Sequence, residues 1–157
     1  MQKERRKEIA EIVGMVAILV SLVFLAFEIR QSNRIAIAST EIGIRNAYSE
    51  FNRSVHSGPD LAELLSRAKD SDVDWSPTEE VKLLMAVSDI VNIWQTVETA
   101  CINGIAQEET CAELDDDIRA FVATFPGLQK TWSLMLDSYP SLAHMNTFKI
   151  LRQALEG

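Results

Sequence analysis

A long apolar run near the amino terminus is the strongest feature of the hydrophobic pattern. Residues 12–27 read IVGMVAILVSLVFLAF and contain no charged side chain. Extended to residues 9–29, the run has 21 positions, with Glu11 and Glu28 near its two ends. At about 1.5 Å of rise per residue, such a helix covers roughly 30 Å, the thickness of the hydrocarbon core of a bilayer. The pattern therefore predicts a transmembrane helix over residues 9–29.

Two other interpretations of this run stay open. A secretory signal peptide would end in a cleavage site with small residues, whereas the chain here reads Phe27-Glu28-Ile29-Arg30. A core helix of a soluble protein is the second alternative. The transmembrane helix is favoured over both, because the run is long enough to span and carries its charges only near its ends.

Beyond the run, apolar residues recur at spacings of seven, four, three and four, namely at Ile37, Ile44, Tyr48, Phe51 and Val55. These positions share one face of a helix, so the pattern predicts that an amphipathic helix continues through residues 30–56. Glu41 and Arg45 have the spacing of an i, i+4 ion pair, and we expect them on another face. The segment Ser57-Gly58-Pro59-Asp60 ends this helix and begins the next one.

The remainder of the chain predicts further helices separated by short breaks. Ser76-Pro77-Thr78-Glu79 has the form of a capping box with Pro at the first helical position, and it starts a helix expected to run to about Cys101. The apolar stripe of that helix consists of Leu83, Val87, Ile90, Trp94, Val97 and Cys101. Other helices are predicted over residues 61–68, 108–125, 132–136 and 142–155. The predicted fold class is all-α: a transmembrane helix continues into a long amphipathic helix, which packs with a four- to five-helix soluble bundle over residues 57–157.

Charge is unevenly divided along the chain. The net charge is −8 overall, +2 over residues 1–56 and −10 over residues 57–157. Binding to nucleic acid needs clustered Lys and Arg, so the acidic balance argues against nucleic acid as the main partner. The predicted span follows Lys3, Arg5, Arg6 and Lys7 and precedes Arg30 and Arg34. The positive-inside rule then places the basic tail, residues 1–8, in the cytoplasm, the span in a bacterial inner membrane and the acidic bundle in the periplasm.

One loop has the first half of a calcium-binding pattern. Asp70, Asp72 and Asp74 have the D-x-D-x-D spacing of such a loop. Positions six and twelve need Gly and Glu, but they hold Trp75 and Val81 here. A solvated loop is therefore favoured over a divalent-cation site.

The other polar groups do not form a recognisable reactive set. Six carboxylates gather near the helix start at residue 108: Glu108, Glu109, Glu113, Asp115, Asp116 and Asp117. They complement the helix dipole, so a solvated face is favoured over a patch for a cation or a basic partner. His56 and His144 are isolated, and no carboxylate pair has a neighbouring His or Lys for acid–base chemistry. We therefore predict no catalytic residue, cofactor or metal ion, and we do not expect an enzyme.

The two cysteines flank a predicted helix connection. Cys101 ends one helix, Cys111 begins the next, and Asn103-Gly104 lies between them. Antiparallel helices would bring the two thiols together, which makes a disulfide the favoured pairing and a free buried pair the alternative. The C-x-x-C spacing of redox and metal sites is absent. A lasting disulfide would also require an oxidising compartment such as the periplasm.

Small residues recur on one side of the predicted span. Ala10, Gly14, Ala17 and Ser21, which we call the small-residue face, are spaced by four, three and four positions, and Glu28 lies on the same side. Small residues allow two transmembrane helices to approach closely. A carboxylate at the interface is better placed against a donor of a partner than against lipid. The alternative is chance, since small residues are common in spans. The pattern favours binding to other transmembrane helices, in a homo-oligomer or a larger complex.

Several short motifs occur in order over residues 20–105. They are Glu28-Ile29-Arg30-Gln31, Arg34, Ala38-Ser39-Thr40, Phe51-Asn52, Pro59-Asp60-Leu61-Ala62, Asn92-Ile93-Trp94 and Asn103-Gly104-Ile105. This pattern resembles a broad group of uncharacterised bacterial membrane proteins. The resemblance implies one amino-terminal span and a helical domain, and it implies no activity or catalytic residue. The chain departs from the group at Cys101 and Cys111, where other residues are usual, which makes the pair a local addition.

These observations favour one class of function and leave a second one open. Packing faces are abundant and reactive groups are not, which favours a non-enzymatic, membrane-anchored accessory or scaffold subunit. Its expected partners are the lipid bilayer and other transmembrane helices. The alternative is a membrane-tethered sensor whose helical domain binds a ligand or a partner.

Overall fold

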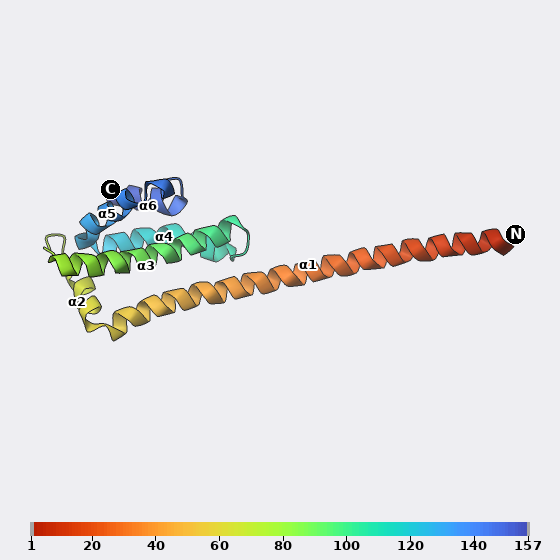
Figure 1. Ribbon diagram of the computed structural model, residues 1–157, viewed down its shortest axis with the longest axis horizontal. Coiled ribbons are helices and arrows are strands. Elements are labelled where there is room, and N and C mark those ends of the chain that lie inside the picture. Colours follow the sequence, from red (N-terminus) through yellow and green to blue (C-terminus); the bar gives the residue numbers. More distant parts are fainter. Residues whose placement is uncertain (1, 157) are drawn as a thin grey trace. The chain divides into compact units, whose positions relative to one another are not determined.

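The computed structural model describes residues 2–156, and these residues form six α-helices and no strand. The helices are α1 (Gln2–Ser57), α2 (Pro59–Arg67), α3 (Pro77–Ile102), α4 (Glu108–Thr124), α5 (Gln129–Ser138) and α6 (Asn146–Glu156) (Figure 1). Short 3₁₀ turns cover Pro126–Leu128 and Pro140–Leu142. The all-α expectation is confirmed. The chain divides into two compact units, Met1–Ala38 and Ser39–Gly157.

The first unit is the amino-terminal part of α1. Every residue from 5 to 35 is exposed, and the large apolar side chains of residues 9–29 are each between 51% and 71% exposed. A core helix of this chain would bury these side chains, so that alternative is not supported. By length and composition, α1 is the one helix of the described residues that could cross a membrane.

The core of the second unit surrounds α3. This helix contacts α2, α4, α5 and α6, and α4 also contacts α6. The predicted apolar stripe is buried from Leu83 to Val97, while Cys101 at its end is half-buried. Residues from the neighbouring helices complete the core, among them Leu114 and Ile118 of α4, Trp132 of α5, and Phe148 and Leu151 of α6. The predicted apolar stripe of α3 therefore lies within this core.

The carboxyl-terminal part of α1 contributes one face to the same core. Ile44 is buried, and Tyr48, Phe51 and Val55 are half-buried against the core, as their spacing predicted. The expected Glu41–Arg45 ion pair is wrong, because no such pair forms in the described residues. Glu41 lies on the packed face with Ile44 and is itself buried. Its carboxylate accepts hydrogen bonds from Gln107, just before α4, and from Thr110 in α4, which a local spacing rule does not anticipate.

Helix ends follow local chemistry closely. At the start of α3, the Ser76 side chain accepts from the Glu79 backbone N–H and the Glu79 side chain accepts from the Ser76 backbone N–H, which confirms the predicted capping box. The last helix begins at Asn146 instead of the expected residue 142, because Pro140–Leu142 form a 3₁₀ turn. In 3₁₀ geometry the chain turns more tightly than in an α-helix, so these residues do not extend α6.

The acidic loop after α2 packs against the break between α4 and α5. The Gly127 backbone N–H donates to the Ala68 carbonyl at 2.8 Å, and the Trp75 indole N–H donates to the Gly127 carbonyl at 3.1 Å. A Cβ at position 127 would lie 2.7 Å from a Val73 methyl carbon, so only glycine fits this approach. The loop is thus part of the packed structure, and the Asp70 side chain accepts from the Asp72 backbone N–H at 3.0 Å.

Candidate functional site

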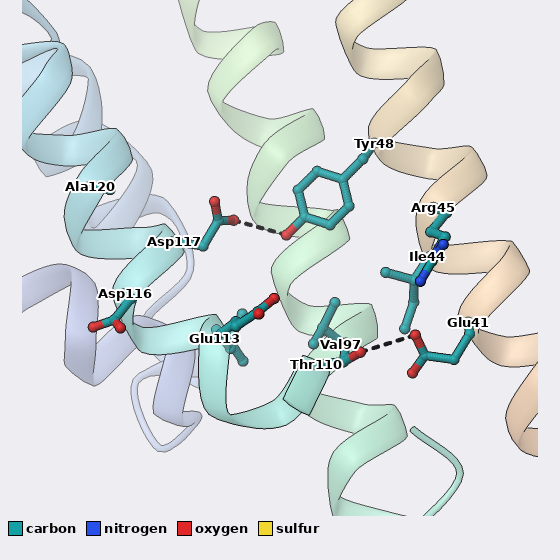
Figure 2. A pocket seen from close by; sticks show the side chains of 11 residues that line it. Glu41, Ile44, Arg45, Tyr48, Val97, Thr110, Glu113, Asp116, Asp117 and Ala120 are labelled. Carbon is teal, nitrogen blue, oxygen red and sulfur yellow. Dashed lines mark hydrogen bonds between the residues drawn. The ribbon is translucent and has the colours of Figure 1, made fainter. Parts of the chain in front are cut away.

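A cleft of about 500 Å³ lies between the carboxyl-terminal part of α1 and helix α4, with α3 behind it (Figure 2). All of its lining residues belong to the second unit. Helix α1 contributes Glu41, Ile44, Arg45 and Tyr48, α3 contributes Val97, and α4 contributes Thr110, Glu113, Leu114, Asp116, Asp117 and Ala120. Apolar side chains thus lie beside four carboxylates and one guanidinium.

Asp117 joins three helices. Its Oδ2 accepts from the Tyr48 hydroxyl of α1 at 2.9 Å and from the Trp94 indole N–H of α3 at 2.7 Å. Burial, followed by the charge and hydrogen bond of Asp117, raises the pKa of Tyr48. The phenol therefore stays protonated and donates throughout the neutral range. We call this arrangement the Tyr48–Asp117 contact.

Glu41 holds the start of α4. Its Oε1 accepts from the Gln107 backbone N–H at 2.8 Å, and its Oε2 accepts from the Thr110 hydroxyl at 2.9 Å. Gln107 is the residue that precedes α4, and its own side chain makes no capping hydrogen bond. A helix start leaves backbone N–H groups without intrahelical partners, and a carboxylate also suits the positive end of the helix dipole. Glu41 therefore caps α4 from another helix, and we call this arrangement the Glu41 cap.

Glu98 caps the start of α6 in the same way. It is 6% exposed, and its carboxylate accepts from the backbone N–H groups of Asn146 and Thr147 at 2.7 and 2.8 Å and from the Thr147 hydroxyl at 2.6 Å. Burial raises the pKa of Glu98, but these hydrogen bonds from Thr147 and Asn146, with the charge of Lys149, outweigh it and lower the pKa overall. The buried carboxylate of Glu98, on α3, thus fixes the first turn of α6 by hydrogen bonds.

The six carboxylates near the start of α4 differ in their hydrogen-bond and ion-pair partners. Asp117 accepts two hydrogen bonds from other helices, and Asp115 pairs with Arg119 of α4 at 2.7 Å. Glu108, Glu109, Glu113 and Asp116 are exposed. Within residues 2–156, no group of three or more His, Cys, Asp or Glu side chains has a metal-binding arrangement. Asp115 and Asp117 are exposed as well, so Asp117 lies on the solvated side of α4 and at the same time makes a structural contact with α1 and α3.

The structure joins the two cysteines. The Cys101 and Cys111 Sγ atoms are 2.09 Å apart, and the bridge links the last turn of α3 to the first turns of α4. Gly104 in the connection has a positive φ of 66°, the conformation in which glycine is favoured. Both half-cystines are half-buried. Formation of the bond in the cell remains a prediction that depends on the compartment.

The small-residue face lies wholly in the first unit and is exposed. A Cβ at Gly14 would have no heavy atom within 4 Å outside its own helix backbone, and Glu28 is also exposed. The Ser21 hydroxyl donates to the Ala17 carbonyl at 2.8 Å, so its donor is used within α1. A hydrogen bond from Ser21 to a partner helix would have to replace this one. The face itself is unobstructed.

The lone histidines bond locally. A ring nitrogen of His56 lies 2.7 Å from the Asn52 carbonyl, and one of His144 lies 2.8 Å from the Ser141 carbonyl. Sequence reasoning missed the three buried or interhelical carboxylate contacts, although one signal was present. A buried indole N–H usually has an acceptor, and that of Trp94 donates to Asp117. The sequence did not show which carboxylate would supply it.

Comparison with protein-family models, with curated proteins and with solved structures finds no match to this chain. The resemblance to single-span bacterial membrane proteins therefore stays a prediction.

Proposed function

We propose that this chain is a non-enzymatic accessory or scaffold subunit, anchored in a membrane by residues 9–29, that packs against other transmembrane helices. The observation that carries the proposal is that every large apolar side chain of residues 9–29 is exposed. Surface of this kind and extent is unfavourable in water and favourable in a bilayer, and an α-helix satisfies its own backbone groups there. Outside the span, helices α2 to α6 and the end of α1 form the bundle.

The same reasoning supports a partner helix. Lipid tails are as apolar as leucine side chains, so association of helices in a bilayer depends on close packing. The small-residue face is exposed, and its glycine is open to an approaching backbone. The partner helix can come from a second copy of the chain or from a different membrane protein. The two cases predict assemblies of different size.

The cleft supports a second candidate function, a membrane-tethered sensor. Glu113 and Asp116 are exposed at the cleft, and Glu41 and Asp117 are occupied by contacts within the chain. We place the scaffold first because the carboxylates that join different helices in the cleft, Glu41 and Asp117, already serve the packing of α1 on α4. A ligand that stabilised the second unit against unfolding would favour the sensor instead.

Two experiments test the anchor and its orientation. Extraction of membranes with alkaline carbonate should leave the protein in the pellet, and its release would overturn the anchor. Fusions of alkaline phosphatase and of a fluorescent protein at the carboxyl terminus should be active and dark, respectively, if the second unit is periplasmic. A bright, phosphatase-negative pair would reverse the orientation.

A third experiment tests the partner helix. Gly14→Leu with Ala17→Leu should reduce the size of the assembly on native gels in mild detergent, because both substitutions block close approach. Val16→Phe with Leu19→Phe adds bulk to the opposite side of the helix and is the matched control. An assembly that is unchanged by the first pair, or equally changed by both pairs, contradicts a role for the small-residue face.

A further inference from the structure

The disulfide and the Glu41 cap act on the same short segment, the start of α4. Gln107 and Thr110 supply the two donors to Glu41, and Cys111 follows Thr110 directly. The Cys111 backbone N–H also donates to the Gln107 carbonyl at 3.2 Å. The position of the Glu41 donors is therefore tied, through one residue and one hydrogen bond, to the covalent bridge with α3.

Few other contacts fix this segment. None of residues 102–113, all of which the structure describes, is buried, and Ala106 is among the few that pack against the core. The first buried residue of α4 is Leu114. Gln107 does not cap the helix with its own side chain. The bridge and the Glu41 cap are thus the main constraints on the first turn of α4.

We propose that the Cys101–Cys111 disulfide is a redox-sensitive switch of the Glu41 cap. A dithiol reductant is the chemical partner. Its thiolate attacks one sulfur of the bridge, forms a mixed disulfide and releases the other cysteine as a thiolate; its second thiolate then displaces the first cysteine. The reductant loses two electrons and becomes a disulfide, while Cys101 and Cys111 gain two electrons and two protons. Both half-cystines are partly exposed, which allows the attack.

Reduction has a local consequence in this proposal. Without the bridge, the first turn of α4 is free to separate from α3, and the Gln107 and Thr110 donors move with it. The Glu41 carboxylate then exchanges these hydrogen bonds for water, and the adjoining part of α1 loses its tie to α4. The switch does not depend on the scaffold function proposed above, since every group belongs to the second unit.

The Tyr48–Asp117 contact provides an internal reference. It lies farther along both helices, and Asp117 is fixed there by the fully buried Trp94 and by its neighbour Ile118, which is also fully buried. No side-chain hydrogen bond joins Tyr48, Trp94 or Asp117 to residues 102–111, which contain the connection and Cys111. Reduction should therefore loosen α1 around Glu41 and leave α1 around Tyr48 in place.

Hydrogen–deuterium exchange on the full chain in detergent micelles tests the switch, with the oxidised protein compared with protein treated with dithiothreitol. We expect exchange to rise about tenfold over residues 39–46 and 103–111, since local opening follows the loss of hydrogen bonds to a charged group. Exchange over residues 48–56 should change little. A rise confined to residues 103–111 would overturn the proposal, because the bridge would then act only on its own connection. A rise throughout the second unit would overturn it as well, since the bridge would then support the whole fold.

Variants separate the bridge from the cap. Cys101→Ser with Cys111→Ser should show the exchange pattern of the reduced protein and should not respond to dithiothreitol. Glu41→Ala should raise exchange over residues 39–46 in the oxidised protein, and reduction should then add no further rise there. Glu50→Ala removes an exposed carboxylate from the same helix and should leave the response to reduction intact. Additive effects of Glu41→Ala and reduction over residues 39–46 would show two independent contributions and would contradict the switch.

Discussion

The two parts of α1 differ in whether their apolar side chains are exposed or covered by the core. Over residues 9–29, every large apolar side chain is exposed, whereas over residues 39–57 the apolar side chains of one face are covered by the core and isolated ones such as Ile42 remain exposed. The helical backbone is the same in both parts, so secondary structure does not account for the difference. The pattern of side chains does: a helix that is apolar all round suits lipid, and one with a single apolar face suits a protein core in water.

The largest expected effect comes from placing charge on exposed apolar side chains of the two units. Leu19→Asp with Val23→Asp should cost about 6 kcal/mol of insertion free energy, because each carboxylate would lie near the middle of the hydrocarbon core. Ile42→Asp with Met85→Asp, at side chains of similar exposure in the second unit, should cost about 1 kcal/mol or less. Resistance to carbonate extraction measures the difference. Equal retention of both double variants in the membrane pellet would contradict the difference proposed between the exposed apolar side chains of the two units.

A neighbouring pair of isoleucines sharpens the comparison within one helix turn. Ile44 is 5% exposed and Ile42 is 60% exposed. Ile44→Ala should lower the free energy of unfolding of the second unit by about 3 kcal/mol, because it leaves a cavity beside the core. Ile42→Ala is the matched control and should change it by about 0.5 kcal/mol or less. Urea titration in micelles, followed by tryptophan fluorescence, measures both values, and similar losses would show that this part of α1 does not pack as described.

Local rules predicted the helices well because the relevant interactions are close in sequence. The capping box at Ser76 and Glu79 and the stripe from Leu83 to Val97 each lie within one helix, and both were predicted. The Glu41 interaction was mispredicted because the pairing rule considers only neighbours on α1. Its actual partners, Gln107 and Thr110, are 66 and 69 residues away in sequence. Burial of Glu41 then favours fixed donors over an exposed guanidinium.

The same limit applies to the cleft. Asp117 belongs to a run of three aspartates that are equivalent by composition, and only the packing of α4 selects which of them meets Tyr48 and Trp94. The disulfide was easier to anticipate, since two cysteines at the facing ends of a helix connection have few other arrangements. Packing between helices, which depends on many residues at once, decided the rest of the candidate site.

Glu98 extends the comparison to a buried carboxylate of α3 in the second unit. Glu98→Gln should lower the free energy of unfolding by about 2 kcal/mol at neutral pH, because a buried set of N–H and O–H donors loses a charged acceptor. The folded-state pKa of Glu98 is lower than its ordinary value of 4.5. The stabilisation by the carboxylate is therefore complete above about pH 4.5 and is lost as the pH falls through the lowered pKa.

The pH dependence of this variant distinguishes the effect of the Glu98 charge on stability from the effect of side-chain packing. The difference in unfolding free energy between the wild type and Glu98→Gln should narrow as the pH falls below the ordinary value of 4.5. Glu63→Gln, at an exposed carboxylate of α2, is the control and should change stability little at any pH. A difference for Glu98→Gln that stays constant down to strongly acidic pH would show that the charge does not cap α6.

The smallest expected effect concerns the hydroxyl that ties α1 to α4. Tyr48→Phe keeps the ring and removes only the hydrogen bond to Asp117, so it should cost about 1 kcal/mol at neutral pH. Because the folded-state pKa of Tyr48 is raised above 10.0, the stabilisation is complete below about pH 10 and is lost as the pH rises through the raised pKa. The difference between the two proteins should therefore shrink above pH 10. Tyr139→Phe, at an exposed tyrosine, is the control. If Tyr48→Phe and Tyr139→Phe had the same effect across this range, the Tyr48 hydroxyl would contribute nothing to the packing of α1 on α4.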